Sequence, residues 1–343
     1  MLQPTRTRTD ISFGRVGLRI ALMVLALGTP TRGDEESSPL SGNGSDTQAA
    51  GTVAAETETG LIGAITGSLF GDVYAEGQWR PLSLGTFFTD GWLEPWAAAP
   101  SGRDGLTPRH GWLGAFNGVF FRLWSTQLDY ANGVHSPAGG NRYAGSASIF
   151  LPFSRRFEIL IDEPFVVSNA TIDRRLGYRD ESGDLVVAPR FLLAESVSTT
   201  HVLALEIRTP TGSRATGGGI TSLAPRYEFW TNPVGPWVVR GSTSLVNPLG
   251  NRQTLPTLLT GGLAVGRYFT PHDMLFGDLV FYAACDLSVP LNDTATTATN
   301  VTLGPGTRFH LGADYYFLNY WAFPVTGPHP EQFSVQFALV KLF

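Results

Sequence analysis

The chain of 343 residues has little cysteine, little charge and no long apolar run. Cys285 is its only cysteine, so neither an internal disulfide nor a cysteine-based metal site can form. Charged residues make up only 15% of the chain, well below the roughly one quarter of an average soluble protein. No segment reaches the roughly 18 to 20 consecutive apolar residues that a membrane-spanning helix needs, which argues against a helical membrane protein.

Glycine and aromatic side chains are abundant instead. The chain contains 40 glycines, and 12% of its residues are aromatic. A glycine-rich, aromatic-rich and charge-poor composition fits a membrane β-barrel better than the core of a water-soluble protein.

The amino terminus has the pattern of a secretory signal peptide. The longest apolar run, residues 20–27, stands near the start of the chain behind a flank rich in arginine. We therefore expect residues 1–33 to be a signal peptide rather than a buried core helix. Its removal takes away five arginines and one aspartate, which lowers the net charge from −5 to about −9. Such an acidic chain argues against nucleic acid as a partner.

Two segments without a strand or helix period follow. Residues 34–58 consist mainly of Ser, Thr, Gly, Ala and acidic residues, and we expect a disordered acidic linker because nothing there repays ordering by burial. Residues 59–115 are rich in aromatic side chains, which need a surface to pack on. We expect this segment to dock on the rest of the protein as a plug in a lumen or on a rim, with a simple interfacial tether as the alternative.

From residue 116 to residue 343 the chain repeats one design. Strands of about ten residues alternate between apolar and charged or polar side chains, as where Leu203, Leu205 and Ile207 alternate with Glu206 and Arg208. Alternation alone also fits a soluble β-sandwich. Short turns, however, alternate with longer polar loops, which is typical of bacterial outer-membrane barrels. We predict an all-β fold, a transmembrane antiparallel β-barrel of about 12 strands in the cell outer membrane.

The last strand, residues 331–343, combines the same alternation with a terminal aromatic residue. Phe337, Leu339 and Phe343 fall on one face, which we expect to contact outer-membrane lipid. The pattern resembles the assembly signal that the barrel-assembly machinery reads, although Lys341 departs from it.

Two neighbouring strands carry a family resemblance. They contain Gly183-Asp-Leu-Val-Val-Ala-Pro-Arg-Phe191 and Leu205-Glu-Ile-Arg-Thr-Pro-Thr-Gly212. This pair resembles the proposed transporter barrels encoded with phenol meta-pathway degradation genes, over roughly residues 140–343. The resemblance implies an outer-membrane transporter barrel and, more weakly, an aromatic or hydrophobic solute.

The polar faces of the strands supply the candidate pore lining. Both signs of charge are mixed there, so we expect no strong ion selectivity. The same residues could instead form a salt-bridge network that fills a narrow barrel. The candidates are Arg122, Glu158, Asp162, Arg190, Glu206, Arg208, Arg226, Glu228, Arg240, Asp278, Asp286, Arg308, His310 and Asp314.

Signs of an enzyme or of a cofactor site are missing from the sequence. There is no Gly-x-Ser-x-Gly motif, no Walker-type phosphate loop and no cluster with metal-ligand spacing. His201 falls on a predicted lipid face beside threonines rather than a serine. We therefore expect no enzyme and no cofactor, but a barrel for passive passage or uptake of a small solute. The alternative is a structural or adhesive barrel without a conducting pore.

Deletion of Phe343 tests the assembly signal. Loss of one buried aromatic side chain would cost about 1.5–3 kcal/mol, whereas loss of an assembly signal would prevent insertion. We expect far less barrel in the outer membrane, measured as the heat-modifiable band on gels. Normal membrane levels of the deletion variant would contradict the signal.

Overall fold

The computed structural model describes Gly63, Ser68 and the ranges 79–97, 120–134, 140–168, 179–212, 219–250, 255–272, 274–292, 298–327, 329 and 331–342. Residues 65–343 make one compact unit, which holds every strand. The predicted signal peptide, the predicted linker and Phe343 lie outside the described residues. Among the described residues, no helix has the length and apolar character needed to cross a membrane.

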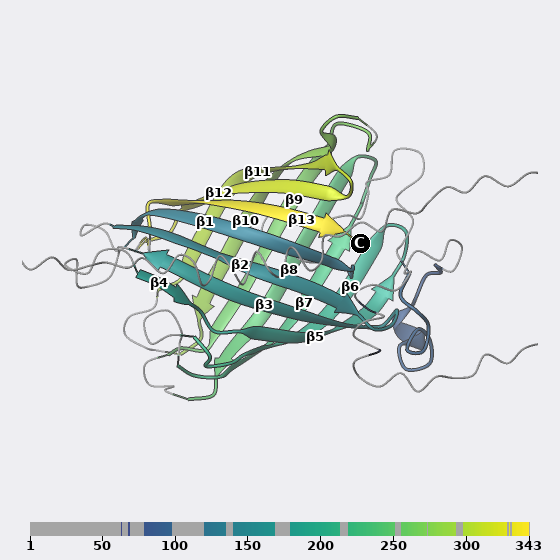
Figure 1. The fold of residues 1–343 in the computed structure, drawn as a ribbon, viewed down its shortest axis with the longest axis horizontal. Helices are drawn as coiled ribbons and strands as arrows, with labels where there is room; N and C mark the ends of the chain where they lie inside the picture. Colours follow the sequence, from purple (N-terminus) through teal and green to yellow (C-terminus); the bar gives the residue numbers. More distant parts are fainter. Residues whose placement is uncertain are drawn as a thin grey trace, which may run out of the picture. The chain divides into compact units, whose positions relative to one another are not determined.

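The chain folds into a closed antiparallel β-barrel (Figure 1). A short 3₁₀ helix, η1 (Leu84–Thr86), precedes the strands. The strands are β1 (Leu123–Val134), β2 (Gly140–Pro152), β3 (Phe157–Ser168), β4 (Arg179–Ser182), β5 (Val186–Glu195), β6 (Thr199–Arg208), β7 (Ser222–Thr231), β8 (Trp237–Pro248), β9 (Leu258–Tyr268), β10 (Gly277–Pro290), β11 (Asn300–Gly312), β12 (Tyr315–Pro324) and β13 (Phe333–Leu342).

Twelve strands form the ring, which confirms the predicted fold class. Each strand pairs with its neighbours in chain order, and β1 closes the ring by pairing with β13 from Leu123 opposite Leu342 to Asn132 opposite Phe333. The thirteenth strand, β4, extends only the far end of β3. The β5 strand continues along the same edge of β3 after an interruption at residues 183–185, so β4 and β5 act as one interrupted strand of the ring.

The two ends of the barrel differ in their connections. Turns at 153–156, 196–198, 232–236, 269–276 and 313–314 join strands at one end, which we call the short-turn rim. The connections at the other end, the long-loop rim, are longer on the whole. In outer-membrane barrels the short turns face the periplasm.

The strand register separates two faces. Residues opposite each other on paired strands share a face, so Glu158, Arg190 and Ala204 form one inward row across β3, β5 and β6. The alternate residues, such as Leu203, Phe281 and Phe337, are exposed on the outer face. This apolar outer face matches lipid, and it carries Phe337 and Leu339 of the predicted assembly signal.

The predicted inward position of Asp314 is wrong. Apolar and polar side chains alternate through residues 308–317 as in one strand, but the chain reverses at Ala313 and Asp314, which both have positive φ (48° and 59°). The expected inward residue Asp314 therefore lies in a tight turn with its side chain 63% exposed. It contacts Lys341 at 3.6 Å instead of lining the interior. The first strand begins at Leu123, after the start of the predicted barrel region at residue 116.

Close packing of Tyr282 on Gly306 gives a test of the interior. The two residues are direct partners on β10 and β11, and a Cβ atom at Gly306 would overlap the Tyr282 ring. We expect Gly306→Val to lower the free energy of unfolding by about 1–3 kcal/mol, since the ring must shift. Urea unfolding in lipid vesicles would measure it. Gly250→Ala is the control, because its nearest neighbour, Ile220 Cγ2, lies at 3.5 Å. Equal midpoints for both variants would contradict this packing.

Candidate functional site in the barrel interior and at the short-turn rim

An ion-pair network crosses the inner wall from β3 to β7. Arg190 on β5 pairs through Nη1 with Glu158 on β3, and through Nη2 with Glu228 on β7 at 2.7 Å. The small side chain of Ala204 lies opposite Arg190 on the intervening strand, which leaves room for the guanidinium to reach β7. All three charged side chains are buried. Buried charges are tolerated only when they are paired in this way.

The network continues toward the long-loop rim and becomes exposed there. Arg226 pairs with Glu206, and its Nε lies 3.8 Å from Glu228 Oε1. The side chains of Arg226 and Glu206 are 25% and 23% exposed, and Arg208 at the end of β6 is exposed. Solvent therefore reaches the inner wall from the long-loop side.

A second polar cluster lies on the opposite wall. Arg308 on β11 donates through Nη2 to the hydroxyl of Tyr268 at 2.6 Å and lies over the rings of Tyr268 and Tyr316. The Tyr316 hydroxyl donates to Asp278 at 3.2 Å, and His272 Nδ1 lies 2.7 Å from the same carboxylate oxygen. Arg308, Asp278 and Tyr316 are buried. This cluster fills the interior near the short-turn rim.

Apolar side chains complete that filling. Phe150, Val202, Val280 and Leu342 belong to one buried cluster on the inward face. Trp96 and Phe121 join it and pack edge to face, with ring centroids 5.5 Å apart. The short-turn half of the interior thus has a packed core. In the long-loop half, among the described residues, the inward side chains of Arg226, Glu206 and Arg208 are partly exposed or exposed.

The candidate pore-lining residues divide between these halves. Eleven lie on the inner wall by strand register, Asp278 is buried at a register shift at the start of β10, and Arg122 is buried in the chain just before β1. Asp314 is the exception corrected above. Those buried in the short-turn half are Glu158, Arg190, Glu228, Arg240, Asp278 and Arg308. The partly exposed or exposed ones toward the long-loop rim are Asp162, Glu206, Arg208, Arg226 and Asp286. His310 is partly exposed at the short-turn end of β11, opposite Tyr316.

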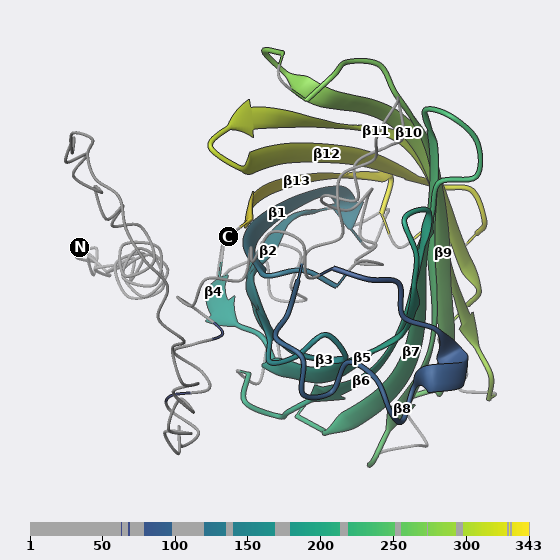
Figure 2. The same ribbon diagram turned by 90° about the vertical axis from the view of Figure 1, so that its right-hand side faces the viewer.

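The rim segment, residues 79–97, binds to the short-turn rim. In Figure 2 it is drawn in dark blue and runs across the barrel end that faces the viewer. The backbone groups of Leu82 and Glu195, the last residue of β5, exchange two hydrogen bonds of 2.9 and 2.8 Å. These contacts join residues 79–97 to the rim. Residues 98–115 and most of residues 59–78, which belong to the same predicted plug or rim segment, lie outside the described residues.

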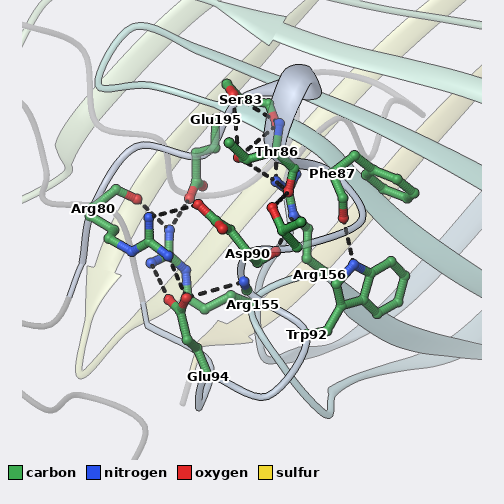
Figure 3. A network of polar contacts seen from close by, with 12 residues as sticks. Arg80, Ser83, Thr86, Phe87, Asp90, Trp92, Glu94, Arg155, Arg156 and Glu195 are labelled. Carbon is green, nitrogen blue, oxygen red and sulfur yellow. Dashed lines mark hydrogen bonds and ion pairs between the residues drawn. The ribbon is translucent and has the colours of Figure 1, made fainter.

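Arg156, in the β2–β3 turn, holds the rim segment to the barrel (Figure 3). Its guanidinium donates to the carbonyl oxygens of Ser83, Thr86 and Asp90 in the segment at 2.9–3.2 Å. It also donates to the carbonyls of Leu192 and Leu193 on β5, both at 2.8 Å. Burial lowers the pKa of this guanidinium from its ordinary value, and the five carbonyl acceptors offset the cost of desolvating it.

Arg155 adds a second attachment beside it. Its Nη2 donates to the carbonyl of Arg80 at 2.7 Å and to Glu195 Oε2 at 3.1 Å. Trp79 Nε1 donates to the same Glu195 oxygen at 2.9 Å. The backbone N–H of Arg155 donates to the carbonyl of Glu94 at 3.1 Å. We call Arg155, Arg156 and Glu195 the rim clasp.

Exposed charges brace the segment internally. Arg80 pairs with Asp90 at 3.2 Å and with Glu94. The hydrogen bond from Arg80 holds the pKa of the Glu94 carboxyl below its ordinary value. A depressed folded-state pKa means that this stabilisation is present above the unfolded pKa of about 4.3. It is lost as the pH falls through the folded-state pKa.

Sequence reasoning missed the rim clasp. The only local signal is a pair of arginines in a four-residue turn of a charge-poor chain. Their partners are mostly backbone carbonyls about 70 positions away, and such partners leave no trace in side-chain patterns.

Arg190 offers a test of the buried network. Arg190→Met leaves Glu158 and Glu228 buried without their cation, and we expect a loss of about 3–5 kcal/mol in the free energy of unfolding. Urea unfolding in lipid vesicles would measure it. Arg226→Met is the control, because its partly exposed side chain should cost much less. Adding Glu158→Gln and Glu228→Gln to Arg190→Met should restore most of the stability. Equal losses for the two arginine variants would contradict a buried network.

Comparison with known proteins gives a likeness of fold. No family model matches the chain, and no curated protein sequence matches it. An outer membrane channel from Pseudomonas putida F1 matches with a TM-score of 0.53 at 11% identity, over 68% of this chain and 100% of that one. The NanC porin matches with a TM-score of 0.46 at 9% identity, over 64% of this chain and 99% of the porin. The first likeness shows that the chain has the fold of an outer-membrane β-barrel.

Proposed function

We propose that the protein is a passive outer-membrane channel for a small solute. The observation that carries this proposal is the partly exposed charged wall of the long-loop half, where Arg226, Glu206 and Arg208 meet solvent inside a closed ring. A barrel with a purely structural role could fill its whole interior with packed side chains. The similarly folded protein from Pseudomonas putida F1 is described as an outer membrane channel, which agrees with this role.

The solute that fits this interior best is small and aromatic or hydrophobic. Without Asp314, the candidate pore-lining residues comprise six acids and six arginines, so the interior attracts neither cations nor anions strongly. Deeper in the barrel, Phe150, Tyr282 and Tyr320 belong to the buried cluster, and such side chains favour an apolar solute over an ion. The resemblance to barrels of phenol meta-pathway gene clusters points to the same class.

The rim segment acts as a gate in this proposal. The rim clasp holds it on the short-turn rim, and Trp96 and Ala97 at its end are buried in the barrel. Passage then requires the segment or the packed core beside it to move. This packed core is also the one observation that favours the alternative, a structural or adhesive barrel without a conducting pore.

Planar-bilayer conductance of the refolded full chain tests the channel and the gate together. We expect rare or small openings for the unmodified chain and more frequent or larger ones for Arg156→Ala, because that change removes the donor to three segment carbonyls. Heat-modifiable migration verifies that each variant forms the barrel.

Arg80→Ala is the matched control for this experiment. It removes an exposed arginine of the rim segment, whose ion pairs contribute little, and leaves Arg156 in place. We expect its conductance to match that of the unmodified chain. No channel events in any folded variant would reject the channel in favour of the structural barrel. Events that Arg156→Ala does not change would reject only the gate.

A further inference from the structure

The rim segment presents apolar side chains to its surroundings at the short-turn rim. Phe88 is 89% exposed, Leu84 is 64% exposed and Leu93 is fully exposed. We call these three residues the rim knob. The same short segment buries Leu82 and Trp96 in the barrel, so its apolar residues divide between an inward set and an outward set. An outward apolar set of this size usually marks an interaction surface.

The rim knob is continuous with the lipid-facing surface of the barrel. Phe157 on β3 and Phe191 on β5 are cross-strand partners on the outer face, with ring centroids 5.5 Å apart. Trp92 of the rim segment packs against Phe191 at 6.2 Å. Phe87 then packs edge to face on both Trp92 and Phe88, at 5.3 and 5.0 Å. One chain of aromatic contacts thus leads from the outer wall of the barrel to the knob.

Other short turns expose apolar side chains too. Met274, Leu275 and Phe276 are exposed in the β9–β10 turn, and Val234 is exposed in the β7–β8 turn. Along the ring, β7 lies two strands from β5 and β9 lies four strands from it, so the exposed apolar residues extend beyond the part of the rim that the rim segment contacts. A protein partner would cover one side of the rim, whereas a membrane surface surrounds all of it.

A groove of mixed character lies beside the rim knob. It has a volume of about 510 Å³, and its polar lining includes Arg80, Asp90, Glu195, Thr199 and His201 beside apolar residues such as Leu84. His201 is on the outer face of β6, paired in register with Phe229.

We propose that the rim knob inserts into the phospholipid leaflet on the short-turn side of the membrane. The rim segment then has two attachments: the rim clasp holds it to the barrel, and the knob holds it to the lipid. This inference depends on the barrel fold and its lipid-facing wall. It does not depend on whether the barrel conducts.

Quenching of a fluorescent label by lipid tests the proposal. Phe88→Cys and Leu93→Cys are made in a Cys285→Ser background and labelled with an environment-sensitive dye. The folded full chains are placed in phosphatidylethanolamine and phosphatidylglycerol vesicles that contain lipid with a nitroxide near the head of the acyl chain. The unmodified chain labelled at Cys285, on the outer face of β10, is the lipid-exposed reference. Asp314→Cys, in the exposed β11–β12 turn, is the matched rim control.

We expect quenching at positions 88 and 93 to lie within about twofold of that at Cys285. Interfacial segments insert some 5–10 Å into the boundary between headgroups and acyl chains, which is where the nitroxide lies. Quenching at position 314 should be several times weaker. Quenching at 88 and 93 no stronger than at 314, together with strong quenching by aqueous iodide, would show a water-facing knob and overturn the proposal. Shielding from both quenchers would overturn it in favour of a protein partner or a second copy of this chain.

Discussion

Closure of the ring between β1 and β13 is the constraint on which the rest of the structure depends. Lipid offers no hydrogen-bond partners, so every strand needs a neighbour on both sides. The two ends of the barrel sequence provide this pairing over ten consecutive positions. Once the ring is closed, alternation sends one half of the side chains into lipid and the other half inward. The outward side chains suit lipid because they are apolar. The inward side chains are often charged, and their charges must be compensated in another way.

The interior uses two solutions at two depths. Near the short-turn rim, burial is complete, and each charge needs a nearby partner: Glu158 and Glu228 share Arg190. Near the long-loop rim, solvent reaches Arg226 and Glu206. Water there hydrates the parts of these charged groups that are not in an ion pair. One wall therefore combines buried ion pairs near the short-turn rim with partly exposed ion pairs toward the long-loop rim. The first part is structural packing, and pore lining by the second part remains our proposal.

The sequence predicts the faces of the strands well because alternation is local. A period of two places Glu206 and Arg208 opposite Leu205 and Ile207 whatever the rest of the chain does. The turn at Asp314 was not predicted, because Ala313 and Asp314 adopt positive φ without the Asn-Gly or Asp-Gly pair that usually marks such a turn. An alternating pattern that runs through so short a turn looks like one strand.

Depth in the barrel and contacts of the rim segment are not local, and the sequence predicts neither. Arg190 and Arg226 are the same residue type on the same face of their strands, but Arg190 is buried and Arg226 is partly exposed. This difference comes from the neighbours that ring closure brings beside each arginine. Arg155 and Arg156 look like residues of an ordinary polar turn. Their role depends on carbonyl groups of residues 80–94 that the fold carries to the short-turn rim.

The rim clasp also determines how a gate at this rim could behave. Hydrogen bonds from a charged donor contribute about 1.5–3 kcal/mol each, and Arg156 gives three of them to the rim segment. Release of the segment therefore costs several kcal/mol, which makes the attached state dominant by a factor of a thousand or more at about 1.4 kcal/mol per tenfold. Insertion of the rim knob in lipid would stabilise the attached state of the rim segment further, without adding a contact to the barrel. If the protein is the channel that we propose, with the rim segment as its gate, it would rest closed. Its opening would then depend on a solute or partner that binds the released state better than the attached one.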